Sequence, residues 1–457
     1  MKHFLICLFS ITIAALFSSY AQDRHVSVFY YPWYDTDRHW PEGYLRNELV
    51  TVQPPLLGEY SVRNPQIIAQ HISWSETYGI DNWICSWWGP GSFSDETMKD
   101  YISRQLDTTD VSYCLFYESA GLLNLDNGID FDAAKTEIFR SHFNYMADNF
   151  FSDPSYYKIA GRPVVYIYLT RTFKGDYQNA IRLVRQDMLA LGWDIFLVGD
   201  EVYWGTPNAV RIASLDAITA YNMHGPHQYA GYPAQNGFIA DVDIKFKQYK
   251  QVAESKGVIF IPDVMPGFND RGVRLSVGHY IIPTRVHKDS SHTSTFSQSI
   301  DMAIPLIDNS LNSICITSFN EWHEDTQIEP TIITDPVNVD MDGKTIMTDG
   351  YFYQGYGTDY LDLIRKKLSP GYPLGISGES GIGVSIFPNP ADEYLYVRTE
   401  ERFPFRIEIF SAGGQLVYSR DADDSFVSVS LGDIPAGIYL IKISSDRYGT
   451  NMEFVKR

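Results

Sequence analysis

The strongest constraint on the fold is an alternation of short apolar runs with helix-like stretches between residues 26 and 320. Eight runs, each followed by a crossover of adequate length, are the sequence form of a (β/α)8 TIM barrel. The chain has no Gly-rich phosphate turn after its first run, which weakens the alternative of a doubly wound open sheet. The runs are VSVFYY (26–31), IDNWICSW (80–87), SYCLFYES (112–119), PVVYIYL (163–169), DIFLVGDE (194–201), DAITAYN (216–222), VIFIPDV (258–264) and SICITSFN (313–320).

The chain changes character near residue 370, where Pro and Gly lead into GISGESGIG, a stretch of linker type. Beyond it, short alternating runs such as YLYVRT, FRIEIFS and GIYLIKIS are separated by turn residues. This pattern predicts a small all-β sandwich. We therefore expect the barrel over 22–370, a linker over 371–382 and the sandwich over 383–457.

The first 21 residues read as a signal peptide, because Lys2 precedes an apolar stretch and small residues precede an Ala21–Gln22 cleavage site. The apolar stretch is short for a membrane span, and no later segment is long and apolar enough to be one. The sequence thus predicts export through the periplasm to the cell surface or the extracellular space, without a transmembrane segment.

Charge and cysteine content exclude other classes of function. The formal net charge of −20 argues against a nucleic-acid partner, since phosphates attract Lys and Arg. After signal cleavage an odd number of cysteines remains, Cys85, Cys114 and Cys315, each inside an apolar run. We interpret them as buried small hydrophobic residues, because no Cys or His spacing is that of a zinc site.

In such a barrel the site forms where the strands end, so its candidate residues can be taken from the ends of the runs. Aromatic and carboxylate residues dominate there and lysine is absent, which suits a neutral polyhydroxy ligand better than a phosphorylated one. The candidate substrate contacts are Tyr31, Trp33, Tyr34, His39, Trp40, Trp87, Trp88, Glu118, Tyr221, His224, Asn320, Trp322 and His323.

The segment SFNEWHEDTQIEP (318–330) carries the densest set of ionisable residues at a strand end. Three interpretations are open: an acidic helix start, a metal site of His323 with Glu321 and Glu324, or a carboxylate pair for glycosidic bond cleavage. The spacing is not HExxH and hard-ion loops carry more Asp or Asn, so we expect no metal and no cofactor. Burial beside tryptophan would separate the two carboxyl pKa values, as acid/base catalysis requires.

This segment resembles the signature of glycoside hydrolase family 99, the endo-α-mannosidases and endo-α-mannanases. FYYPWY, GRPVVYIY and FIPDVMPGFNDR extend the resemblance upstream, over most of residues 25–335. It implies a retaining endo-acting enzyme on α-mannosides in which the sugar's own 2-hydroxyl is the nucleophile. Glu321 is then the base and Glu324 the general acid/base, Tyr221 matches the family tyrosine, and Glu329 is assigned a structural role.

The chain also departs from the family pattern. FYESA replaces the usual HIEPY and keeps only Glu118, Asp263 replaces a small residue, and Asp325 stands where the family prefers Gly. Asp325 would either raise the pKa of Glu324 or cap a helix, depending on whether its side chain faces the cleft. Substrate identity is therefore less constrained than reaction type. The alternatives are a glycoside hydrolase on another α-glycan, such as α-glucan, and a non-catalytic surface glycan-binding protein.

The tail resembles the C-terminal sorting domain of type IX secretion in Bacteroidetes. The resemblance lies in IFPNPADEYLYV, IFSAGGQLVYS, IPAGIYLIKI and a closing Lys-Arg. It implies that the type IX secretion machinery is a partner of the chain, beside an oligo- or polysaccharide substrate of the mannan type.

Overall fold

The computed structural model of this chain describes residues 24–224, 237–275, 281–284, 293–369, 384–399, 404–411, 415–445 and 449–457. The expected signal peptide and the whole expected linker lie outside these ranges. Among the described helices, none has the length and apolarity to cross a membrane.

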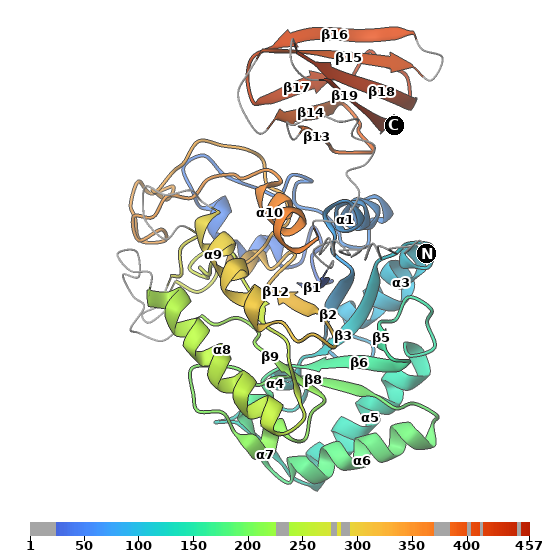
Figure 1. Ribbon diagram of the computed structural model, residues 1–457, viewed down its shortest axis with the longest axis vertical. Coiled ribbons are helices and arrows are strands. Elements are labelled where there is room, and N and C mark those ends of the chain that lie inside the picture. Colours follow the sequence, from blue (N-terminus) through green and yellow to red (C-terminus); the bar gives the residue numbers. More distant parts are fainter. Residues whose placement is uncertain are drawn as a thin grey trace, which may run out of the picture.

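A parallel sheet forms the centre of the larger domain (Figure 1). The neighbours in this sheet follow the order β10-β9-β8-β6-β3-β2-β1-β12-β11. The strands are β1 His25–Tyr30, β2 Asn82–Trp87, β3 Ser112–Tyr117, β6 Arg162–Ile167, β8 Phe196–Asp200, β9 Ala217–Thr219, β10 Ile259–Phe260, β11 Asp263–Val264 and β12 Ser313–Ile316.

The sheet closes on itself because β10 and β11 are two halves of one predicted run, 258–264. β10 pairs with β9 on one side, whereas β11 pairs with β12 on the other. Pro262 lies between the halves, has no N–H for a ladder, and accepts a hydrogen bond from the Cys315 N–H at 2.9 Å through its carbonyl oxygen. β1 lies between β2 and β12. The predicted (β/α)8 barrel is thereby confirmed, and the doubly wound open sheet is wrong.

Helices occupy every crossover between the barrel strands, and α10 follows the last of them. The crossover after β8 is short and contains one helix of four residues, α7. The helices are α1 Pro65–Tyr78, α2 Phe93–Thr97, α3 Ser103–Leu106, α4 Ser119–Leu122, α5 Ala133–Asn149, α6 Tyr177–Ala190, α7 Ala209–Ile212, α8 Gly237–Ser255, α9 Ser294–Ala303 and α10 Asp359–Leu368. Short strands β4 Ile129–Phe131, β5 Lys158–Ile159 and β7 Phe173–Gly175 lie in the loops.

Alternation along each strand divides its side chains between the barrel interior and the helical layer. Phe29 packs edge-on against Phe116 at 4.9 Å between ring centroids and against Tyr221 at 5.0 Å, inside the barrel. Its neighbour Tyr30 stacks instead on Trp83 at 4.4 Å, and its hydroxyl lies 2.9 Å from Nδ1 of His71 on α1. Every second residue of a strand, such as Phe29, therefore points into the barrel. The residues between them, such as Tyr30, pack under the helices.

The C-terminal domain consists of two antiparallel sheets with a hydrophobic core of their own, as predicted from the alternating runs. One sheet has the order β13-β14-β17 and the other β16-β15-β18-β19. The strands are β13 Val384–Phe387, β14 Tyr394–Thr399, β15 Phe405–Ser411, β16 Leu416–Ala422, β17 Phe426–Ser430, β18 Gly437–Ser444 and β19 Gly449–Lys456.

Helix α10, at the edge of the barrel, makes a contact at each of its ends. Arg398 of β14 pairs with Asp359 and Asp362 at the start of α10, the latter at 3.0 Å. At the other end of α10, the Leu368 carbonyl oxygen accepts a hydrogen bond from the Arg24 N–H at 3.2 Å, directly before β1. The first and last residues of the barrel thus meet at the amino-terminal ends of its strands.

Candidate active site

Glu321 precedes and Glu324 ends a single turn of 3-10 helix, η8 (Trp322–Glu324), just after β12. Glu321 caps this turn, because its side chain accepts a hydrogen bond from the His323 N–H at 3.0 Å. The carbonyl oxygen of Glu324 accepts from the Asn269 N–H at 2.7 Å, which ties the turn to the loop after β11. The strand end and the turn bring both carboxylates to the mouth of the barrel.

Glu324 accepts two hydrogen bonds from the end of β9. The Tyr221 hydroxyl donates to its Oε2 at 3.1 Å and Nδ2 of Asn222 donates to the same oxygen at 3.2 Å. Nη1 of Arg274 lies 3.6 Å from Oε1. The side chain keeps 15 % of its surface exposed, compared with 3 % for Glu321, so Glu324 is the more open of the two to solvent.

Glu321 is held by aromatic neighbours. The Tyr34 hydroxyl lies 3.5 Å from its Oε1, and Nδ1 of His323 lies 3.9 Å from the same oxygen. Beside this pair, Tyr31 donates a short hydrogen bond to the hydroxyl of Tyr221, which itself contacts Glu324. Tyr31 and Tyr221 therefore link the ends of β1 and β9 to Glu324, whereas Tyr34 contacts Glu321 separately.

Burial and mutual repulsion act on the pair together. Burial, then the charge of Glu324, raises the pKa of Glu321 well above its ordinary value. Burial also raises the pKa of Glu324, while Arg274 and the Tyr221 hydroxyl oppose this rise. Such a pair titrates as one unit and retains one proton to higher pH than an isolated carboxylate would. One protonated and one ionised carboxyl are the requirement for acid/base chemistry.

Glu118 follows β3 and is a third buried carboxyl at the mouth. Its Oε1 accepts a hydrogen bond from the Ser86 hydroxyl at 2.6 Å. Burial raises the pKa of Glu118 to about 8, and the charges of Glu324 and Asp200 contribute to this rise. Glu118 is therefore largely neutral at pH 7, which limits the negative charge of the pocket.

We predict that Glu118→Gln weakens the dependence of stability on pH. Because the pKa of Glu118 is raised on folding, the folded chain binds its proton more tightly, and stability falls as pH rises from about 4.5 towards about 8. The loss is at most about 1.4 kcal/mol per pH unit in this window. Glutamine carries no such proton, so urea unfolding at pH 5 and pH 8 should differ less for the variant than for the wild type. An unchanged difference would contradict the buried neutral state of Glu118.

Several predicted contacts gather around Trp33 on the loop after β1. The Trp33 ring lies 4.6 Å from Tyr31, 4.7 Å from His39, 6.2 Å from Trp88 and 6.4 Å from His323. Trp88 keeps 43 % of its surface exposed. These rings line the same mouth as the carboxylates and present apolar faces of the kind on which sugar rings stack. His224 lies on the β9 side, stacked on Phe268 at 4.4 Å.

Four other predicted contacts are not directed at the carboxylate pair. The Trp87 indole donates to Asp95 at 2.9 Å and its ring packs edge-on against His142 of α5, on the helical side of β2. The other three side chains are buried. The Trp40 indole donates a hydrogen bond to the Tyr60 carbonyl oxygen, and the Trp322 indole donates one to Glu329. The Asn320 amide exchanges hydrogen bonds with the backbone of Tyr31. The hydrogen bonds of Trp40, Asn320 and Trp322 hold the loops after β1 and β12 in place.

Two residues beside Glu324 were absent from the candidates, Asn222 and Arg274. Asn222 adopts a positive φ of 61°, which turns its amide towards Glu324 directly after Tyr221. Its place at the end of an apolar run marks it as a polar residue of a strand end, but it is not among the candidate substrate contacts. Arg274 follows the FNDR segment by three residues in a loop, where no periodicity marks it.

Asp325 does not face the cleft. It adopts a left-handed conformation, φ 50° and ψ 33°, which explains how Gly could occupy the same position. Its Oδ1 accepts from Nε of Arg46 at 2.5 Å and from Nε2 of Gln327 at 3.1 Å. The Arg46 guanidinium also lies over the ring of Tyr356, 5.0 Å from its centroid. Asp325 is thus half of a buried ion pair, directed away from Glu324.

Glu329 is fully buried and accepts hydrogen bonds from Tyr60 at 2.8 Å and from the Trp322 indole at 2.7 Å. Nε2 of His71 on α1 lies 3.2 Å from its other oxygen. These contacts join the loops after β1 and β12 to α1, so Glu329 stabilises the fold around the site.

Comparison with known proteins gives concordant matches for both domains. Residues 41–355 match the family described as glycosyl hydrolase family 99, and residues 385–457 match the secretion system C-terminal sorting domain. The chain is 25 % identical over 379 residues to a glycoprotein endo-alpha-1,2-mannosidase-like protein of Mus musculus, covering 74 % of each chain. It is 26 % identical over 349 residues to a glycoprotein endo-alpha-1,2-mannosidase of Xenopus laevis, covering 68 % of this chain and 70 % of that one.

Solved structures share the fold. The GH99 endo-alpha-mannosidase from Bacteroides thetaiotaomicron superposes with a TM-score of 0.54 at 21 % identity, over 76 % of this chain and 97 % of that one. A glycoside hydrolase-like protein superposes with a TM-score of 0.57 at 19 % identity, over 80 % of this chain and 97 % of that one. The matched family model covers most of the chain and includes the carboxylate pair. The chain therefore belongs to glycosyl hydrolase family 99, and it ends in a secretion sorting domain.

Proposed function

We propose that the barrel is a retaining endo-acting hydrolase of α-mannosidic linkages in mannan or high-mannose glycans. The observation that carries this proposal is the buried pair Glu321 and Glu324, in which Glu324 contacts Tyr221, Asn222 and Arg274. The curated relatives named endo-alpha-1,2-mannosidase support the choice of mannose. Exposed Trp88 and half-buried Trp33 offer rings to the faces of neighbouring sugars.

In the proposed reaction the substrate's 2-hydroxyl attacks its own anomeric carbon. Glu321 takes the proton of that hydroxyl as the C1–O2 bond forms, while Glu324 gives a proton to the glycosidic oxygen as its bond to C1 breaks. Glu324 then takes a proton from water, which attacks C1 of the 1,2-anhydro sugar, and Glu321 returns its proton to O2. Two inversions at C1 give net retention.

The geometry supports this division of roles. The His323 N–H donates to Glu321 and partly offsets the rise in its pKa that burial and the charge of Glu324 cause. The more exposed Glu324 faces the cleft, where a leaving group can depart. Since the two carboxyls share their titration, the ionised form of one favours the protonated form of the other.

The test combines a substrate screen with a fluorine substitution. We expect release of oligosaccharides from α-mannan or from trimmed and glucosylated high-mannose glycans, with no release from α-glucans. The matched 2-deoxy-2-fluoro mannoside should resist cleavage, because fluorine cannot replace the attacking hydroxyl. Product size by chromatography reports endo-action, and NMR of the first product reports the retained anomer.

Other outcomes identify other functions. Cleavage of α-glucans would reassign the substrate, and ready hydrolysis of the fluoro compound would replace the 2-hydroxyl by an ordinary nucleophile. Binding of mannan without turnover under any condition would make the chain a glycan-binding protein.

We propose further that the chain is exported, with residues 1–21 as signal peptide and the C-terminal domain as its address for the type IX secretion machinery. The match of residues 385–457 to the sorting-domain family supports this route to the cell surface or extracellular space.

A further inference from the structure

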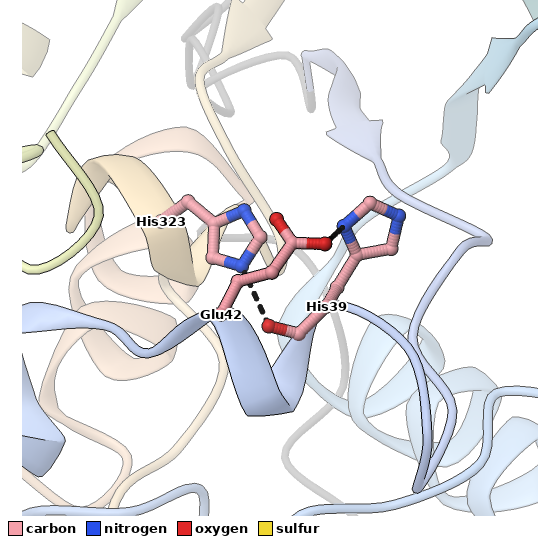
Figure 2. Close-up of side chains that lie close together, drawn as sticks. All are labelled: His39, Glu42 and His323. Atoms are coloured by element: carbon pink, nitrogen blue, oxygen red, sulfur yellow. Dashed lines mark hydrogen bonds and ion pairs between the residues drawn. The ribbon is translucent and has the colours of Figure 1, made fainter.

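The loop after β1 and the turn η8 bring two imidazoles and a carboxylate together beside the active site. One donor atom each from His39, Glu42 and His323 lie within 4.8 Å of one another (Figure 2). His39 and Glu42 follow β1, whereas His323 follows β12, so only the closed barrel unites them. This set differs from the one considered in the sequence, where His323 was grouped with its neighbours Glu321 and Glu324.

The donor set has the chemistry of a transition-metal site. Two imidazoles and one carboxylate are the ligands of many zinc sites that keep an open fourth position. Nδ1 of His39 and Oε1 of Glu42 lie 3.3 Å apart, close to the separation of two ligands at tetrahedral zinc with bonds of about 2.0–2.1 Å. Nδ1 of His39 is itself buried, and its contact with Glu42 lacks the alignment of a good hydrogen bond.

The site is both held in position and open to solvent. The Trp33 ring stacks on His39 at 4.7 Å and on His323 at 6.4 Å, which restricts the rotation of both imidazoles. The Glu42 side chain is 59 % exposed, so an ion can enter without opening the fold. Burial lowers the pKa of both histidines, which favours the neutral form that binds metals.

His323 connects this cluster to Glu321. Its Nε2 lies 3.0 Å from the His39 carbonyl oxygen, which Figure 2 shows on the side of the cluster, while its Nδ1 lies 3.9 Å from Oε1 of Glu321. The carbonyl oxygen can only accept, so Nε2 carries the ring proton and Nδ1 is the nitrogen that can bind a metal. A cation on Nδ1 would therefore lie beside the Glu321 carboxylate.

We propose that His39, Glu42 and His323 form a site for a divalent transition metal of the zinc class, which inhibits turnover when occupied. The inhibition rests on the proposed function, because a cation on Nδ1 of His323 would attract the Glu321 carboxylate, which would otherwise receive the substrate's 2-hydroxyl proton. Metal binding itself does not depend on that function.

Binding is tested on the full chain, first freed of metal with a chelator and then titrated with zinc sulfate in a calorimeter. We expect one zinc per chain and no binding of Mg²⁺, which prefers oxygen ligands. Glu42→Gln should weaken zinc binding by more than about tenfold. His39→Asn should do the same, since Asn tolerates the positive φ of 66° at this position. Glu254→Gln, at an exposed position of α8, is the charge-matched control and should bind zinc as the wild type does.

Two results would overturn the site: no zinc binding by the wild type, or wild-type affinity in both Glu42→Gln and His39→Asn. Zinc should also inhibit hydrolysis with a midpoint equal to its dissociation constant, and Glu42→Gln should keep basal activity but need more zinc for inhibition. Full activity of the zinc-bound wild type would overturn the link to Glu321. A chain that binds zinc at this site but hydrolyses no glycan would refute the proposed function and leave the metal site standing.

Discussion

Replacing Glu324 with glutamine should lower kcat on an α-mannoside by about 10²–10⁴-fold, the usual contribution of a general acid/base. Glutamine retains an oxygen that accepts hydrogen bonds from Tyr221 and Asn222, so the side chain should keep its position. It cannot give a proton to the leaving oxygen. The dissociation constant of a mannoside ligand should therefore change by only a few-fold, which calorimetry measures beside steady-state kinetics.

A substrate whose leaving group needs no proton distinguishes the roles of the two carboxylates. A mannoside whose aryl leaving group departs without protonation should restore much of the first step in Glu324→Gln. The same substrate should not rescue Glu321→Gln, because attack by the 2-hydroxyl still needs its base. Equal rescue of both variants, or turnover in Glu324→Gln similar to the wild type, would contradict the assignment of roles.

Among the substitutions considered, we expect the largest loss of stability from breaking the buried ion pair between Arg46 and Asp325. Both side chains are 2 % exposed, and Asp325→Asn leaves the guanidinium charge buried without its carboxylate. The expected loss in the free energy of unfolding is about 3 kcal/mol, measured by urea denaturation. Asn tolerates the left-handed backbone at this position, so the loss reports the charge and not the conformation.

A double mutant provides the internal control. Arg46→Met in the Asp325→Asn background removes the unpaired charge and should recover a substantial part of the lost stability. Asp100→Asn breaks the exposed pair with Arg104 on the neighbouring helical turn and should cost less than about 1 kcal/mol. A loss in Asp325→Asn as small as that of Asp100→Asn would mean that water reaches the Arg46 guanidinium.

Much of the barrel was predictable from sequence because parallel strands buried on both faces produce conspicuous apolar runs. The same property hides which face of a strand a residue occupies. All six residues of β2 are buried, so nothing in the run distinguishes Ser86, which contacts Glu118, from Trp87, which contacts α5. The break at Pro262 was visible as a proline, but only the pairing of its two flanks shows that the barrel closes there.

The candidate site was predictable where residues are near in sequence and unpredictable where the fold unites them. Glu321 and Glu324 lie three residues apart on one turn, so their motif indicated a pair. Asp325 and Arg46 are 279 residues apart, and no local pattern reports such a partner. The same holds for His39 and His323, whose contact depends on β1 lying beside β12.

The hydrogen bond between Arg24 and Leu368 has an evolutionary consequence. A domain whose entry and exit points coincide can be inserted into, or recombined between, larger proteins without rearranging its interior. Here both points lie at the amino-terminal ends of the strands, on the face opposite Glu321 and Glu324. New flanking modules can therefore be acquired or exchanged while the carboxyl-terminal face retains its chemistry.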